Sequence, residues 1–125
     1  MNIQTPTPTD AAAATDSAQR ALRADLAGLS REAVFLPARD WDVWCDAVRP
    51  RLRALRQELK GPASAHAGLV RSHRSLLARL DALAMEAALH VEPPLWTGAL
   101  RELLADIALY EERENELPLQ PGARD

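Results

Sequence analysis

The sequence has few aromatic residues, few β-branched residues and one cysteine. Aromatic side chains make up 4% of the chain, and Ala, Leu, Arg and Glu dominate the remainder, a composition that favours helices over strands. The lone thiol, Cys45, cannot form an intrachain disulfide, which fits a reducing compartment. No apolar run approaches the roughly 20 residues that a membrane-spanning helix needs, and the N-terminus lacks the pattern of a secretory signal. We therefore expect a cytoplasmic, all-α protein that has no membrane partner.

The chain also lacks the sequence features of nucleic-acid binding and of several kinds of catalysis. Its net charge is −3 and it has no long basic run, so nucleic acid is not an expected partner. It contains no Gly-rich phosphate loop, no HExxH motif and no CxxC motif. Its 125 residues suffice for one domain with a core of its own. The sequence therefore indicates one small domain that is not an enzyme.

The most regular pattern of the chain lies between Ser64 and His90. Apolar residues and all three histidines recur there at alternating steps of three and four, which places them on one face of an α-helix. This face comprises His66, Leu69, His73, Leu76, Leu80, Leu83, Ala87 and His90, with Leu77 and Ala84 beside it. Gly61 and Pro62 precede the stretch as a helix stop and a restart. We predict a helix from Pro62 to about Leu89.

Two helices are expected before this one. The first follows a candidate cap at Asp16 or Ser17 and ends before Pro37, because proline disfavours the α conformation of the residue that precedes it. The second opens at Asp40, and Pro50 inside it predicts either a kink or two short helices. Their apolar stripes consist of Leu22, Leu26, Leu29, Ala33 and Leu36, and of Trp41, Trp44, Cys45, Val48, Leu52, Leu55 and Leu59.

A fourth helix is expected to begin near Leu95 and to end at Pro118. Its stripe consists of Trp96, Leu100, Leu103, Ile107, Tyr110, Glu114 and Leu117. Four amphipathic helices with short connections predict an up-down-up-down antiparallel four-helix bundle. The chain then divides into a disordered N-terminal arm, the bundle and a short polar tail, at residues 1–15, 16–118 and 119–125.

Polar residues interrupt two of these stripes at one level of the bundle. If the third and fourth helices are antiparallel, His73 lies level with residue 112, between Tyr110 and Glu114, which are four residues apart and point the same way. We therefore predict a His73–Tyr110–Glu114 cluster inside the bundle. A buried carboxylate must be paired, hydrogen-bonded or metal-bound, so the cluster is either a metal-free polar network or part of a metal site. A histidine–carboxylate pair within it would be sensitive to pH.

The other polar and aromatic side chains are expected to have structural roles. His66 and His90 lie near the ends of their helix and are assigned to capping or to solvent, and Cys45 is assigned to the core. The three tryptophans should close one end of the bundle or, if exposed, mark a partner site. A solvated face is expected for Arg51, Arg53 and Arg56, with a patch for an anion or an acidic partner as the alternative. The carboxylates Glu111, Glu112, Glu114 and Glu116 are expected to form a mostly solvated helix end, with binding of a cation or a basic partner as the alternative.

Three segments resemble helices of hemerythrin-like domains. LVRSHRSLLARLDALAMEA resembles the third helix of that family, which carries a metal-ligating histidine, and LRELLADIALYEERENELPLQ resembles the fourth. ALRADLAGLSREA is similar to the family's opening helix. The resemblance spans most of residues 18–120, and it implies the four-helix fold of the HHE cation-binding type.

The resemblance carries over only part of the family's metal-ligand set. His73 matches the third-helix ligand and Glu114 matches the acidic ligand of the fourth helix. Tyr110 and Leu26 stand where histidine ligands are expected, and only Glu58 remains of the ligands of the second helix. A diiron site needs several histidines and carboxylates converging from all four helices. One His, one Glu and one Tyr from two helices are too few.

These observations lead to one leading function and two alternatives. The leading hypothesis is a hemerythrin-like bundle that has lost its diiron site and acts, without a cofactor, as a non-enzymatic binding or regulatory module for a protein partner. The first alternative is a metal-binding domain that holds iron or another divalent metal through the reduced set His73, Tyr110 and Glu114. The second alternative is a structural bundle that self-associates through its heptad seams.

Overall fold

The computed structural model of the chain describes residues 8–59 and 67–116. These ranges contain four α-helices, α1 (Pro8–Glu32), α2 (Trp41–Glu58), α3 (Ala67–Ala88) and α4 (Thr97–Glu116), and three short 3₁₀ helices, η1 (Ala33–Phe35), η2 (Ala38–Asp40) and η3 (Pro93–Leu95). They contain no strand, so the predicted all-α class is confirmed for this part of the chain.

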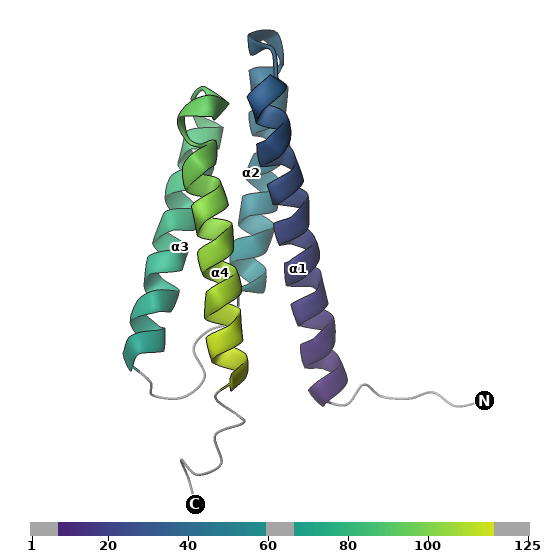
Figure 1. The fold of residues 1–125 in the computed structure, drawn as a ribbon, viewed down its shortest axis with the longest axis vertical. Coiled ribbons are helices and arrows are strands. Elements are labelled where there is room, and N and C mark those ends of the chain that lie inside the picture. Colours follow the sequence, from purple (N-terminus) through teal and green to yellow (C-terminus); the bar gives the residue numbers. More distant parts are fainter. Residues whose placement is uncertain (1–7, 60–66, 117–125) are drawn as a thin grey trace, which may run out of the picture.

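The four helices lie side by side along one long axis (Figure 1). Helix α1 packs against α2 and α4, and α3 packs against the same two helices. The turn between α1 and α2 lies at the same end of the molecule as the turn between α3 and α4, and η1 contacts η3 there. Each helix therefore has two neighbouring helices, and its apolar stripe is covered by them.

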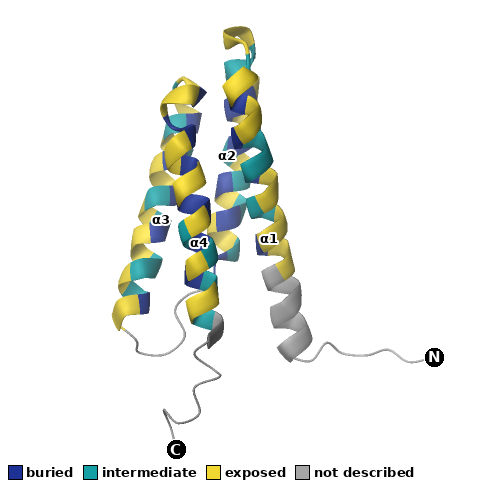
Figure 2. Ribbon diagram, viewed as in Figure 1, coloured by how far each residue is buried: buried dark blue, intermediate teal, exposed yellow. Residues whose placement is uncertain are grey.

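Apolar residues from all four helices form one core. Figure 2 shows the buried positions on the helix faces that look toward one another, with exposed positions on the outer faces. Fully buried members of the core include Leu26, Val48, Leu52, Leu55, Leu80, Leu100, Leu103 and Ile107. These are the positions that the steps of three and four selected, because a stripe with that spacing faces one direction on an α-helix.

The ends of the first two helices differ from the predicted ones. Helix α1 begins at Pro8, well before the predicted cap at Asp16 or Ser17. Proline is tolerated in the first turn of a helix, where its missing N–H would have no intrahelical partner, and the alanines after it have high helix propensity. Asp40 does precede α2, but its side chain makes no capping hydrogen bond. Residues 1–7, 60–66 and 117–125 lie outside the described residues, and the predicted polar tail lies among them.

Helix α2 runs without interruption through Pro50, so of the two predicted outcomes, a kink or two short helices, the second does not occur. Pro50 is exposed, which leaves its ring on the solvent side of the helix. Pro50 has no N–H, so the carbonyl oxygen of Asp46, four residues earlier, loses its intrahelical donor. The next carbonyl oxygen, that of Ala47, accepts a hydrogen bond from the Arg51 guanidinium Nη1 at 2.5 Å.

Two tryptophans close the end of the bundle that carries both turns. Trp44 and Trp96 are each 4% exposed, and their ring centroids lie 5.2 Å apart. Each indole N–H donates to a backbone carbonyl oxygen, Trp44 to Leu29 at 2.9 Å and Trp96 to Val91 at 3.1 Å. Closure of this end was predicted for all three tryptophans; it is confirmed for Trp44 and Trp96, whereas Trp41 is only half-buried. Cys45 is also fully buried beside them, as predicted.

Burial sets the chemistry of the Cys45 thiol. Its Sγ lies 3.6 Å from the carbonyl oxygen of Val91. Loss of solvent, with Asp42 and Asp46 nearby, raises the pKa of Cys45 to about 11. The thiol therefore stays protonated near neutral pH and has the structural role expected from the sequence.

No helix in the described ranges combines the length and the apolar content that crossing a membrane requires.

Candidate functional site

The predicted polar cluster lies between α3 and α4, in the half of the bundle far from the two turns. His73 comes from the second turn of α3 and Tyr110 from the last third of α4. Their ring centroids are 5.9 Å apart and the ring planes are inclined by 38°. The structure therefore brings together two residues that are 37 positions apart in the sequence, at the level that the antiparallel folding of the two stripes predicts.

Tyr110 is joined to Glu114, one helical turn further along α4. The side chains of Tyr110 and Glu114 are hydrogen-bonded, and the Tyr110 side chain is almost fully buried. Burial, the negative charge of Glu114 and this hydrogen bond together raise the pKa of Tyr110 to about 12. The phenol is consequently protonated at neutral pH, and it is the donor to the Glu114 carboxylate.

The Nε2 atom of the His73 imidazole is buried. The Nε2 atom has no hydrogen-bond partner among the described residues. A buried polar atom without a partner costs free energy, because it has lost its hydrogen bonds to water. The ring is held by its contact with Tyr110, while Nε2 remains available to a water molecule or another ligand.

An ion pair between α1 and α4 lies one residue away from Tyr110 along α4. The Arg23 guanidinium Nη2 donates to the Glu111 carboxylate, and both side chains are mostly buried. Glu111 was expected on a solvated face, and this prediction was wrong. The pairing partner lies 88 residues away in the sequence, so the periodicity of α4 alone gives no sign of it.

Gln19 is a second buried polar residue that the sequence did not indicate. Its side chain is 1% exposed, and its Nε2 donates to the backbone oxygen of Glu58 at 3.0 Å. Glu58 is the last residue of α2, so its carbonyl belongs to the group that has no intrahelical donor. Gln19 therefore caps α2 from a neighbouring helix. Its position, seven residues before Leu26 and so on the same helix face, was the available signal.

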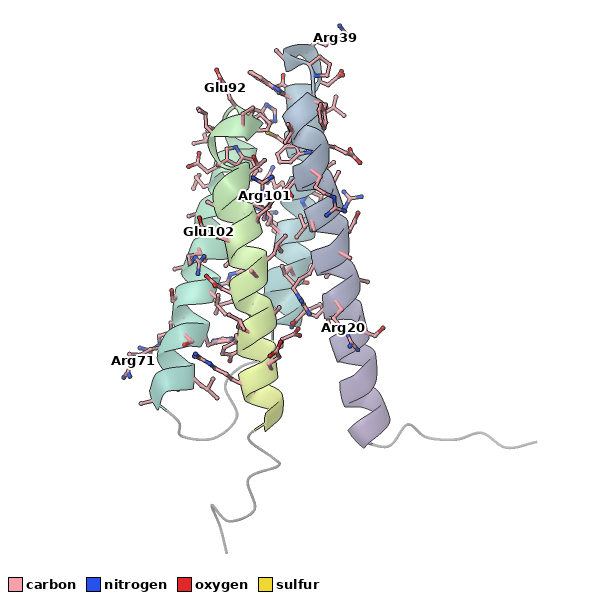
Figure 3. All side chains as sticks on the ribbon, in the orientation of Figure 1. Arg20, Arg39, Arg71, Glu92, Arg101 and Glu102 are labelled. Atoms are coloured by element: carbon pink, nitrogen blue, oxygen red, sulfur yellow. The ribbon has the colours of Figure 1, made fainter. Side chains whose placement is uncertain are left out.

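A cavity of about 360 Å³ opens beside Tyr110 on the outer side of α3 and α4. Its lining includes Tyr110, Leu76 and three arginines, Arg71, Arg79 and Arg113. Arg79 is paired with Asp106 across the two helices at 2.8 Å. Figure 3 shows Arg71 projecting outward from the start of α3. The cavity therefore lies directly beside the tyrosine of the polar cluster.

The interior does not fit a diiron centre. The position of the expected first-helix ligand holds Leu26, which is fully buried in the apolar core. The expected relic on α2, Glu58, contributes its backbone oxygen to the bond with Gln19. Within the described ranges no group of three or more His, Cys, Asp or Glu side chains is arranged to hold a metal ion. The remaining donor set is His73, Tyr110 and Glu114, and Tyr110 would have to lose a proton that its surroundings retain.

The other candidate residues lie elsewhere. His90 is at the opposite end of α3, where its imidazole contacts Asp42 and Asp46 of α2, and His66 lies outside the described residues. Arg51 and Arg56 are paired with aspartates of the neighbouring helices, Asp25 on α1 and Asp81 on α3, at 2.6 and 2.7 Å. These arginines thus connect helices across the bundle surface.

Comparisons with protein-family models, with curated proteins and with solved structures found no match for this chain. Its function is therefore inferred from its residues and their geometry.

Proposed function

We propose that the protein is a non-enzymatic binding module built on a hemerythrin-like bundle that has lost its diiron site. In this proposal His73, Tyr110 and Glu114 form a metal-free polar network that fixes α3 against α4, and the protein acts through its surface. The proposal includes the up-down-up-down topology. Contacts between the early part of α1 and the end of α2, and between the early part of α3 and the late part of α4, support it.

The hydrogen bond from Tyr110 to Glu114 carries the proposal. A carboxylate on the inward stripe of α4 needs a partner, and the protonated phenol supplies one from within the chain. The positions at which further ligands would be needed hold buried apolar residues such as Leu26. The Glu114 carboxylate is therefore satisfied by Tyr110 without an ion, in keeping with a structural role.

The exposed apolar side chains favour binding at the surface over a reaction in the interior. Seven large apolar side chains in the described ranges are more than half exposed: Val34, Phe35, Val43, Met85, Leu89, Leu95 and Leu109. Single exposed apolar residues are normal, but a concentration of them marks an interaction site. Most of these residues lie at or beside the two turns, at one end of the bundle. The partner in this proposal is a protein, and the compartment that we predict remains the cytoplasm.

A metal-binding function is the second candidate, and one observation favours it. The buried Nε2 of His73 has no partner in the described part of the chain, which is the condition expected of a ligand atom awaiting an ion. Three protein ligands with one open position are the minimum of a catalytic zinc site. In this alternative His73, Tyr110 and Glu114 would hold iron or another divalent metal.

Elemental analysis and metal titration separate the two candidates. The protein, purified without a tag, is analysed for metal and then titrated with Fe²⁺, Mn²⁺ and Zn²⁺, in parallel with His73→Ala and with His90→Ala as a matched histidine control. We expect no stoichiometric metal in any of the three, and His73→Ala to be less stable than the wild type. A stoichiometric ion that His73→Ala abolishes and His90→Ala retains would overturn the metal-free proposal.

A further inference from the structure

The end of the bundle that carries both turns has the shape of a step. The turn between α1 and α2, residues 33–40, rises above the turn between α3 and α4, residues 89–96 (Figure 1). We call these the high turn and the low turn. They touch each other through η1 and η3, so the step is one continuous surface. Figure 2 shows that this surface is mostly exposed.

Each level of the step carries large apolar side chains. On the high turn Phe35 is 87% exposed and Val34 is 62% exposed. On the low turn Leu95 is 72% exposed and Leu89 is 69% exposed. Phe35 is the only phenylalanine of the chain. An aromatic side chain exposed to water at a turn forgoes the favourable free energy of burial. The tryptophans beneath already close the core, so these four side chains are not needed there.

The two levels also carry opposite outer charges. Arg39 projects from the high turn and Glu92 from the low turn (Figure 3). Both residues are exposed, and neither forms an ion pair within the described ranges. The nearby carboxylates of Asp42 and Asp46 are engaged with His90. An arginine on one level and a glutamate on the other are complementary between two copies of the same surface.

We propose that two copies of the chain associate head to head through this step, related by a two-fold axis perpendicular to the bundle axis. When this axis also runs parallel to the edge of the step, a half-turn places the high turn of each copy over the low turn of the other. Phe35 and Val34 of one copy then meet Leu95 and Leu89 of the other, and Arg39 faces Glu92 twice. An isologous contact of this kind closes on itself and stops at the dimer.

This dimer rests on the proposed binding function, with a second copy of the chain as the protein partner. The end of a bundle of four helices packed two by two measures roughly 20 by 20 Å, given helix diameters of about 10 Å. The resulting contact of roughly 400 Å² per copy is smaller than the roughly 800 Å² of a stable complex. The dimer is accordingly weak and reversible, with a dissociation constant in the micromolar range.

Sedimentation velocity of the full chain from about 1 µM to about 500 µM tests the proposal. We expect the weight-average sedimentation coefficient to rise from that of the monomer toward that of the dimer over this range. Phe35→Ser should weaken association at least tenfold, whereas Leu109→Ser, which removes an exposed apolar side chain away from the step, should leave it unchanged. Circular dichroism and thermal unfolding of each variant establish that it is folded.

A charge exchange tests the orientation. Arg39→Glu and Glu92→Arg should each weaken association, since like charges then face each other twice, and the double variant should restore it. A chain that stays monomeric at the highest concentration, or a dimer that neither Phe35→Ser nor the charge exchange alters, would overturn this inference. A monomer without metal leaves the proposed binding role standing with another protein partner, whereas stoichiometric metal at His73 removes that proposed function and not the dimer.

Discussion

The Nε2 atom of His90 lies 2.8 Å from Oδ1 of Asp46, which ties the end of α3 to the first turns of α2. The other ring nitrogen, Nδ1, lies 3.3 Å from Asp42. The backbone of His90 has φ 55°, in the left-handed region where glycine is the usual residue. Its N–H bonds to the oxygen of Ala87 at 3.1 Å, and that of Val91 bonds to the oxygen of Glu86 at 3.0 Å, which is the Schellman termination of a helix. The left-handed backbone conformation costs free energy at a residue other than glycine, and the contacts of the imidazole with two carboxylates offset that cost.

This pairing should make the stability of the protein depend on pH. The hydrogen bond to Asp46 is the largest of the effects that raise the pKa of His90 above 6.5, and the charges of Asp46 and Asp42 add to it. A raised pKa in the folded state means that the stabilisation is fully present below the unfolded-state pKa and is lost as the pH rises through the folded value. We expect the urea midpoint of the wild type to fall between about pH 6 and about pH 8.5.

Two variants test whether His90 causes this pH dependence. Asp46→Asn should reduce the decline, because it removes the largest cause of the raised pKa of His90. Asp25→Asn should lower the urea midpoint equally at both pH values, since its partner Arg51 does not titrate in this range. An equal decline in the wild type and in Asp46→Asn would show that His90 is not the group responsible.

Tyr110 should titrate at unusually high pH. The chain has one tyrosine, so the ultraviolet absorbance of phenolate reports on Tyr110 alone. With a pKa of about 12, only about a tenth of the phenol should be ionised at about pH 11 in the folded protein, whereas in urea it should titrate near 10. The stabilisation is full below pH 10 and is lost as the pH rises through 12. Ionisation of the folded protein near neutral pH would instead indicate a phenolate held by a cation.

Loss of either buried tryptophan should destabilise the bundle strongly. Trp44→Ala and Trp96→Ala should each cost about 3–5 kcal/mol of unfolding free energy, because each leaves a cavity in the core and a backbone carbonyl without its donor. A double-mutant cycle should give a coupling of about 0.5–1.5 kcal/mol for rings in this tilted contact. Trp41→Ala, at a half-buried position, is the matched control and should cost less. Additive effects at Trp44 and Trp96 would contradict a direct ring interaction.

Gln19 should contribute to stability although it lies on a small polar stretch of α1. Gln19→Ala removes the donor that caps the last carbonyl of α2 and should cost about 1–3 kcal/mol in a urea unfolding experiment. The neighbouring Arg20→Ala is the control, since Arg20 is exposed and points outward (Figure 3) and should change the free energy of unfolding by about 0.5 kcal/mol or less. Equal effects of the two substitutions would mean that the bond to Glu58 contributes nothing measurable.

The candidate site was predictable where it followed the helical period. His73, Tyr110 and Glu114 occupy inward positions of two stripes, and the prediction that these stripes are antiparallel was sufficient to predict that His73 meets Tyr110. The pair of Arg23 and Glu111 was not predictable in this way. A long charged side chain beside the apolar stripe can reach solvent or a neighbouring helix, and only the position of that neighbour decides which.

The sequence by itself determined the helices, their inward faces and the residues that form the core. Local propensity and a repeat of three and four residues suffice for this, because an α-helix turns by a fixed angle per residue and water excludes the apolar stripe. Tertiary structure alone decided the contacts between polar groups far apart in the chain: Gln19 with the end of α2, Arg23 with Glu111, and His90 with Asp46. It also decided that the two turns differ in height, because that depends on how far each pair of helices slides along the bundle axis.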